Sequence, residues 1–153
     1  YESLRIIEKL KPKYVVWENV KNLLSKKHKH NFDNYLKRME DMGYKNYYQV
    51  MNSKDYGIPQ NRERVFTVSI RKDIKKDFKF PDPMPLKKKL KDLLEDKVDE
   101  KYFLSDKLIE CFTKDGTGGY PRKEQFLSGI DREIGKCVTT KAGSRPVDNY
   151  VSE

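Results

Sequence analysis

A short apolar run near the N-terminal end most constrains what this chain can fold into. Val15, Val16 and Trp17 follow Lys-Pro-Lys with no polar residue among them. Such a run is typical of a strand that is buried on both faces of a parallel sheet. The run stops at Glu18 and Asn19, and open α/β sheets bind ligands at the carboxyl ends of their strands. We therefore expect Glu18 at the edge of a site, where an acid can hold or pass a proton, although a surface residue that caps the next segment fits the same pattern.

The spacing of the other apolar residues predicts an α/β fold around this strand. A helix is predicted at residues 2–10, and an amphipathic helix at residues 32–42 is closed by Gly43. Two further strands are predicted at residues 47–51 and 64–70, and the second is the strongest strand signal in the chain. Helices that alternate with strands in this way favour an α/β sheet.

The character of the sequence changes after residue 71. A proline-rich stretch at residues 80–85 predicts a boundary or linker. The weaker signals that follow predict short helices at residues 86–94 and 102–112, a short strand at 136–140, and turns at 116–119 and 142–144. The lysines at 87–89 favour a solvated helix face over a DNA clamp.

Composition narrows the class of protein. The chain has 153 residues, of which 36% are hydrophobic and 37% charged, and this favours a thin core, long exposed segments or a piece of a larger protein. Because the first residue is Tyr1, we expect a fragment or a processed form. The formal net charge of +9 suits nucleic acid. An AT-rich genome, whose proteins are rich in lysine, would give the same charge.

Several kinds of site are disfavoured. Cys111 and Cys137 form neither a disulfide framework nor a CxxC pair, and His28 and His30 lack a third metal ligand. No apolar run is long enough to span a bilayer. We expect a reduced, soluble, cytoplasmic protein that uses neither a membrane nor a metal.

The stretch between the last two strands has the residues of a binding site. Gly57 and Pro59 fix a turn, and the side chain of Gln60 can donate and accept hydrogen bonds. Arg62 and Arg64 alternate at the entrance to a strand, which predicts both guanidinium groups on one face. Neighbouring guanidinium groups suit phosphates, a base edge or a carboxylate that must be held in place. The alternative is a surface strand with its Arg-Glu-Arg side chains in solvent.

These residues resemble the DNA (cytosine-5) methyltransferases. Glu18 and Asn19 look like part of the family's Glu-Asn-Val motif, and Gln60, Arg62 and Arg64 match its Gln-x-Arg-x-Arg motif in the usual Asp-Tyr-Gly-Ile-Pro context. The resemblance implies an α/β fold, namely the later half of a Rossmann-like S-adenosylmethionine-dependent methyltransferase sheet plus a small, mostly irregular target recognition region. It divides the chain into residues 1–79, the C-terminal part of the catalytic domain, and residues 80–153, a linker and partial target recognition domain.

The resemblance also implies a reaction. In this family a cysteine thiolate attacks a flipped cytosine in double-stranded DNA, and C5 takes a methyl group from S-adenosylmethionine. Glu18 would contact N3 and the exocyclic amine, and Asn19 would shape the nucleophile loop. Arg64 would hold the base carbonyl, while Gln60 and Arg62 would support the DNA backbone or the loop. A prokaryotic or phage restriction-modification system, near the nucleoid, is the expected setting.

The sequence departs from the family at two points. It contains neither the Pro-Cys nucleophile dipeptide nor the Phe-x-Gly-x-Gly methyl-donor loop, and Cys111 and Cys137 lie in the wrong region to replace the nucleophile. We therefore expect an inactive fragment whose cofactor site lies mostly elsewhere, in a missing N-terminal part or a complementing chain. The alternatives are a non-catalytic DNA-binding or regulatory module derived from this fold, and a structural domain that binds no DNA.

Overall fold

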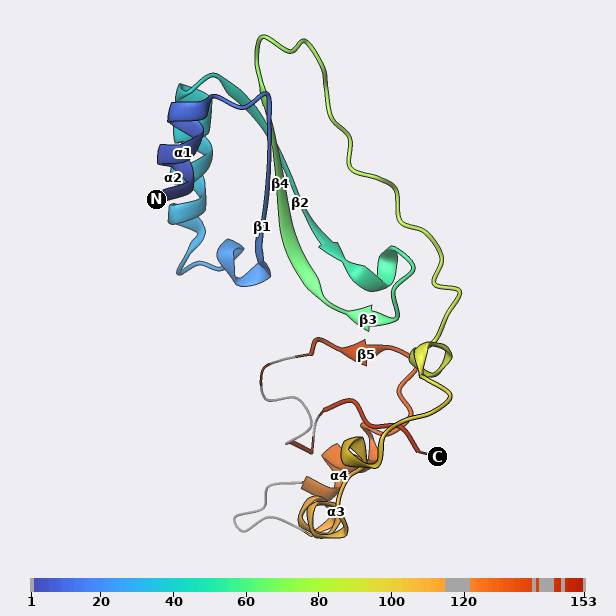
Figure 1. Ribbon diagram of the computed structural model, residues 1–153. Helices are drawn as coiled ribbons and strands as arrows, with labels where there is room; N and C mark the ends of the chain where they lie inside the picture. The colour runs from blue at the N-terminus through green and yellow to red at the C-terminus, as the bar shows by residue number, and fades with distance from the viewer. Residues whose placement is uncertain (1, 115–121, 139, 141–144, 147, 153) are drawn as a thin grey trace. The chain divides into compact units, whose positions relative to one another are not determined.

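The computed structural model describes residues 2–114, 122–138, 140, 145–146 and 148–152. The chain divides into two compact units (Figure 1). Unit 1 comprises Tyr1–Asn52 and Glu63–Pro83, and unit 2 comprises Ser53–Arg62 and Met84–Glu153. Within the described part of the chain, no helix has both the length and the apolar character that crossing a bilayer requires.

Unit 1 is built on a three-stranded sheet in the order β1-β4-β2. Its strands are β1 (Tyr14–Val20), β2 (Tyr44–Asn52) and β4 (Glu63–Arg71). Since β4 pairs antiparallel with both neighbours, β1 and β2 run in the same direction on either side of it. The register sets Val16 opposite Val68 and Glu18 opposite Phe66.

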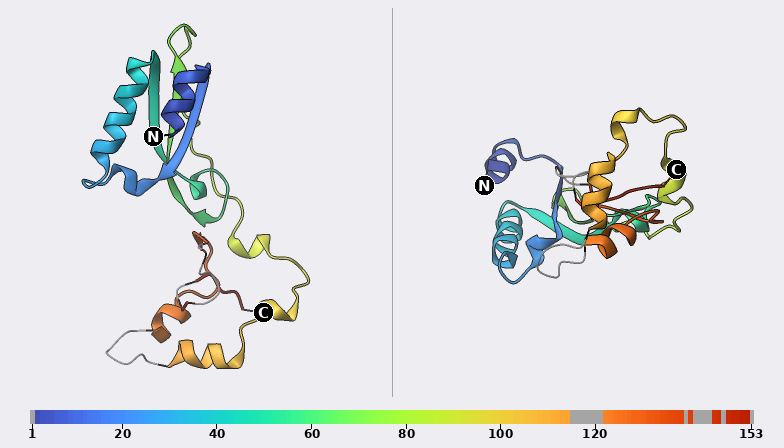
Figure 2. Two further views of the ribbon diagram at one scale, coloured as in Figure 1. Left: turned by 60° about the vertical axis from the view of Figure 1, so that its left-hand side comes forward. Right: turned by 90° about the horizontal axis from the view of Figure 1, so that it is seen from below.

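Two helices, α1 (Glu2–Leu10) and α2 (Lys29–Asp41), cover one face of this sheet (Figures 1 and 2). We call it the inner face. Its core is a buried cluster of Leu4, Ile7, Phe32, Tyr35, Met39, Tyr44 and Val65. The Trp17 ring lies 4.6 Å from the Tyr35 ring and 6.2 Å from the Phe32 ring, measured between centroids, so β1 and α2 are joined by aromatic packing.

On the other face of the sheet, which we call the outer face, lies none of the helices that the structure describes in unit 1 (Figures 1 and 2). Along β1 the exposure alternates, and Tyr14 and Val16 keep 51% and 69% of their surface. The prediction that this strand is buried on both faces of a parallel sheet is therefore wrong for the described strands. The physical reason is that β4, which follows β2 after residues 53–62, inserts antiparallel between β2 and β1, while both helices pack on the inner face.

The remaining predictions for unit 1 are confirmed with small shifts of boundary. The first helix has the predicted bounds, and it ends where Lys11 takes a positive φ of 44° just before Pro12. The second begins at Lys29, three residues early, and Gly43 follows it with a φ of 88°. A 3-10 helix, η1 (Lys21–Leu24), connects β1 to α2, and its two leucines pack against the core.

Unit 2 has less regular structure. A parallel pair joins β3 (Gln60–Asn61) to β5 (Gly135–Lys136), and the described residues include the short helices α3 (Asp106–Thr113) and α4 (Arg122–Leu127). The rings of Phe112, Phe126 and Tyr150 lie 5.4 to 5.9 Å apart between centroids and form a small aromatic core.

Two sequence predictions in this unit need correction or stay open. Instead of a helix at residues 86–94, the structure has only a 3-10 turn, η3 (Leu90–Leu93). Leu93 and Leu94 are 51% and 48% exposed, and a short lysine-rich helix that buries no apolar face is not stable by itself. The predicted turns at 116–119 and 142–144 lie outside the described residues.

Candidate active site

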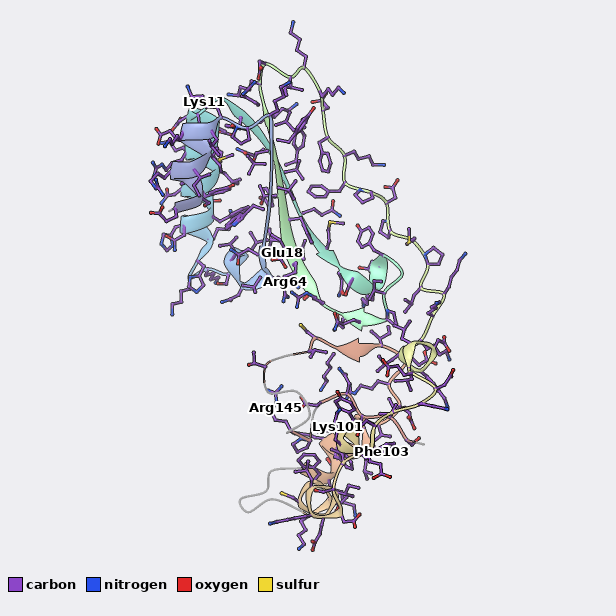
Figure 3. The ribbon with its side chains drawn as sticks, viewed as in Figure 1. Lys11, Glu18, Arg64, Lys101, Phe103 and Arg145 are labelled. Carbon is purple, nitrogen blue, oxygen red and sulfur yellow. The ribbon has the colours of Figure 1, made fainter. Side chains whose placement is uncertain are left out.

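An ion pair between Glu18 and Arg64 forms the centre of the candidate site. Glu18 Oε1 lies 2.9 Å from Arg64 Nε, and the two side chains keep 43% and 19% of their surface exposed. The register sets Glu18 opposite Phe66 and Val20 opposite Arg64, so the two charged residues are diagonal neighbours on the outer face. Figure 3 shows them together at one end of the sheet, with Lys11 near the other end.

Arg64 is held on two sides. Besides the contact with Glu18, its Nη1 donates to the backbone oxygen of Glu63 at 2.8 Å. The Glu63 side chain accepts from Lys21 Nζ at 2.8 Å, which ties the start of β4 to η1. A guanidinium group fixed in this way presents its remaining N–H donors in a defined direction. Sequence reasoning did not find Lys21, because its partner is 42 residues away.

Asn19 has a local role in the structure. Its Oδ1 accepts a hydrogen bond from the backbone N–H of Val20 at 2.8 Å. Asparagine side chains that bond to nearby backbone in this way stabilise the end of a strand and the turn that follows it. Asn19 therefore helps to set where β1 ends and η1 begins.

Gln60 and Arg62 belong to unit 2. Gln60 lies on β3, and its backbone oxygen accepts from Ser53 Oγ at 2.6 Å. The backbone oxygen of Ser53 accepts hydrogen bonds from the backbone N–H groups of Tyr56 and Ile58, at 3.0 and 3.2 Å, in the loop that precedes β3. Ser53 is thus an organiser of this loop, and no spacing signal in the sequence indicated it.

Arg62 lies between β3 and β4, outside either strand. Its Nη1 lies 3.1 Å from Cys137 Sγ, within unit 2. The prediction that Arg62 and Arg64 share one strand face is therefore wrong, because strand alternation does not extend back to Arg62. A separation of 75 residues made Cys137 impossible to identify as its partner from the sequence.

The predicted turn at Gly57 and Pro59 is present. Gly57 has a φ of 84°, a backbone conformation that side chains other than glycine's disfavour. Pro59 is buried, and its oxygen accepts from Gly135 N at 2.8 Å, which anchors the loop to β5. Among the described residues, no three His, Cys, Asp or Glu side chains come together as a metal site requires.

Comparison with known proteins assigns the family. The C-5 cytosine-specific DNA methylase family matches residues 1–149. The Type II methyltransferase M2.ScrFI of Lactococcus lactis subsp. cremoris is 48% identical over 109 residues, which cover 71% of this chain and 30% of that protein. M.Bsp6I of Bacillus sp. (strain RFL6) is 39% identical over 133 residues, or 84% of this chain and 40% of that protein.

Solved structures agree on the fold. A mutant of Spodoptera frugiperda DNMT2 matches with a TM-score of 0.69 and 19% identity, over 96% of this chain and 43% of that one. The Dnmt2 methyltransferase of S. pombe gives a TM-score of 0.65 and 17% identity over 97% of this chain and 48% of that one. The predicted class, part of a Rossmann-like methyltransferase sheet, is confirmed.

The chain thus spans 30% to 40% of the length of these curated relatives. The family match itself extends over nearly the whole chain, across both the Glu18 strand and the Gln60–Arg64 stretch. The chain therefore belongs to the C-5 cytosine-specific DNA methylase family.

Proposed function

We propose that this chain is part of a DNA (cytosine-5) methyltransferase of a restriction-modification system, which transfers a methyl group from S-adenosylmethionine to C5 of cytosine in duplex DNA. The observation that supports this most directly is the ion pair of Glu18 and Arg64 at 2.9 Å. The relatives, which are called Type II methyltransferases, support the restriction-modification setting.

The two side chains of the pair complement the edge of a cytosine. A carboxylate accepts from an exocyclic amine, and when it carries a proton it can share that proton with a ring nitrogen. A guanidinium group only donates, and therefore suits the base carbonyl. Glu18 would accordingly bind the N3 and amine edge of the base, and Arg64 would bind its O2. Because N3, the amine and O2 of cytosine are paired with guanine in duplex DNA, the base must leave the duplex to reach these two side chains.

Asn19, Gln60 and Arg62 would each have a supporting role. Asn19 holds the turn that follows β1, so it would set the position of the loop beside Glu18. Arg62 offers donors to a phosphate or to a loop backbone, and Gln60 precedes it by two residues, on β3. These two residues would support the DNA backbone or the nucleophile loop.

The residues present do not fit S-adenosylmethionine. A groove of about 610 Å³ in unit 1 is lined by apolar side chains, with Lys76 and Asp77 as its charged groups. Asp77 already accepts hydrogen bonds from Lys45 and Tyr47. The sequence also lacks the family's Pro-Cys and Phe-x-Gly-x-Gly motifs. The nucleophile and the methyl-donor site would therefore come from methylase polypeptide outside these residues.

A hybrid enzyme tests the proposal. This chain would replace the matched stretch of the Lactococcus lactis relative, and transfer of a labelled methyl group to duplex DNA would be measured. Glu18→Gln should lower kcat/KM at least about tenfold, because the substituted side chain can no longer carry a proton to the ring. An unchanged rate would remove Glu18 from the mechanism.

Glu63→Gln is the matched control. Its carboxylate has the same exposure, 43%, and also forms one ion pair, at 2.8 Å. Its expected effect on kcat/KM is about twofold or less, since exposed ion pairs contribute little. The chain by itself should show no methyl transfer, and turnover without added polypeptide would contradict its status as one part of an enzyme.

A second candidate function is DNA binding without catalysis, which the net charge of +9 favours. It predicts that the chain alone binds duplex DNA and that its affinity falls steeply with salt. A gel shift over a salt series measures this. Absence of binding near physiological salt would leave only a role within the larger enzyme or a structural one.

A further inference from the structure

A contact between an arginine and a cysteine joins two distant parts of unit 2. Arg62 Nη1 donates to Cys137 Sγ over 3.1 Å, and both side chains are half-buried. Cys137 Sγ in turn donates to the backbone oxygen of Val138 at 3.7 Å. The thiol hydrogen is thus directed to Val138, and the lone pairs of the sulfur are left to accept from the guanidinium group.

Strand pairing brings these two residues together. β3 and β5 lie side by side (Figure 1), and they pair in parallel with Asn61 opposite Lys136. Arg62 and Cys137 are the next residue of each strand segment, so they continue the same register at the end of the pair. The contact is therefore set by the backbone and does not depend on a chance approach of two side chains.

The side chain of Asn149 fixes β5 further. Its Oδ1 accepts from Lys136 N at 2.7 Å, and its Nδ2 donates to the Lys136 oxygen at 3.0 Å. A backbone residue that is bonded through both its N–H and its C=O is held as firmly as in the interior of a sheet. The chain immediately before Cys137 is thus held by β3 and by Asn149, which leaves the sulfur little freedom to move.

We propose that Cys137 is a positioning residue, whose sulfur holds the Arg62 guanidinium group ready to support the DNA backbone or the nucleophile loop. This rests on the proposed function, in which Arg62 has that supporting role. β3 ends at Asn61, so strand pairing alone does not fix the Arg62 side chain. A long arginine side chain loses rotamer freedom when it binds, and a partner that holds it beforehand removes part of that cost.

A thiol is well suited to this role. A carboxylate in the same place would neutralise the guanidinium charge, whereas a protonated sulfur accepts a hydrogen bond and leaves that charge available to a phosphate. Residues 135–138 would therefore complete the Gln-x-Arg-x-Arg motif from a part of the sequence 75 positions away from Arg62.

Thiol alkylation tests the contact in the chain alone, without reference to activity. Iodoacetamide would be added near neutral pH, and the modification of each cysteine would be followed by peptide mass spectrometry. Because the thiolate is the reacting form and a neighbouring cation favours it, Arg62→Gln should slow the alkylation of Cys137 at least about threefold. Arg62→Lys, which keeps the charge, should restore part of the rate.

The other cysteine of the chain is an internal reference. Cys111 is exposed on α3, and it should react at the same rate in the natural chain and in both Arg62 variants. Equal or faster alkylation of Cys137 in the Arg62→Gln chain would overturn the proposal, since the sulfur would then owe nothing to the guanidinium group.

The L. lactis hybrid tests the consequence for DNA. Cys137→Ala removes the acceptor and should raise KM for duplex DNA about fivefold with kcat nearly unchanged, because the lost interaction acts on binding. Cys137→Ser should restore most of the natural KM, since a hydroxyl oxygen also accepts from a guanidinium group. Cys111→Ala is the matched control and should leave KM within about twofold.

The two measurements separate this inference from the proposed function. If alkylation slows as expected but the hybrid transfers no methyl group, Cys137 holds Arg62 and the proposed function fails. If the hybrid is active and Cys137→Ser raises KM as much as Cys137→Ala, the positioning role is wrong and the proposed function stands.

Discussion

The two faces of the unit 1 sheet differ in how they are completed. On the inner face, α1 and α2 bury the cluster around Phe32 and Met39, both with no exposed surface. On the outer face, Val16 and Tyr14 remain largely exposed beside the Glu18–Arg64 pair. The inner face is thus a buried core, whereas the outer face keeps large apolar side chains exposed in the described chain.

This difference separates stability from function within one sheet. Residues whose contacts all lie on the inner face should affect the folding of the chain alone. Residues on the outer face should affect the activity of the assembled enzyme and should change the stability of the chain alone much less.

A pair of phenylalanines gives the largest expected effect. Phe32→Ala removes a fully buried ring from the inner core and should lower the free energy of unfolding by about 3 to 5 kcal/mol. Phe66→Ala removes a partly exposed ring from the outer face and should cost less than half as much. Urea unfolding of the chain alone measures both. Equal losses would show that the outer face is part of the same core.

Arg64→Lys tests the outer face in the assembled enzyme. Lysine keeps the charge but loses the planar group that contacts both Glu18 and the Glu63 oxygen, so kcat/KM of the hybrid should fall about tenfold. Arg71→Lys, at the other end of β4 and paired with Asp73, is the control and should leave the rate within about twofold. A similar loss in both variants would argue for a general effect on the strand.

A single hydroxyl group tests the inner core more finely. Tyr44 is buried, and its hydroxyl donates to the Pro12 oxygen at 2.7 Å. Tyr44→Phe leaves that acceptor without its donor and should lower the free energy of unfolding by about 1 kcal/mol. Tyr48→Phe, at a position that is 46% exposed, should change it by less than about 0.5 kcal/mol. Unfolding curves of the two variants in the same buffer measure both changes, and equal losses would contradict a special role for the Tyr44 hydroxyl.

The smallest effect concerns Asp77, which lies in the exposed wall of the groove. Hydrogen bonds from Lys45 and then Tyr47 hold the pKa of this carboxyl below its ordinary value. A carboxyl with a lowered folded pKa stabilises the fold above its unfolded pKa of about 3.9, and that stabilisation is lost as the pH falls through the lowered value. Asp77→Asn should therefore be slightly less stable than the natural chain at pH 7, and this difference should shrink as the pH falls through the lowered pKa. A gap that widens in acid would contradict this sign.

Local sequence patterns predicted the inner half of unit 1 well. The helix at Glu2–Leu10 and the strand at Glu63–Arg71 follow from spacing and strand propensity, because their apolar residues face a nearby core. The predicted helix at residues 86–94 failed for the opposite reason, since Leu93 and Leu94 find no surface to pack against.

The sequence by itself determined the family, the residues of the two motifs and most elements of unit 1, because all of these depend on short-range patterns. Only the tertiary structure decided that Glu18 meets Arg64 across two strands, that Arg62 contacts Cys137, and that β1 has one covered and one open face. Glu18 and Arg64 are 46 positions apart in the sequence (64 − 18), and Arg62 and Cys137 are 75 positions apart. Pairings over such distances are set by strand register and loop closure, which no local pattern specifies.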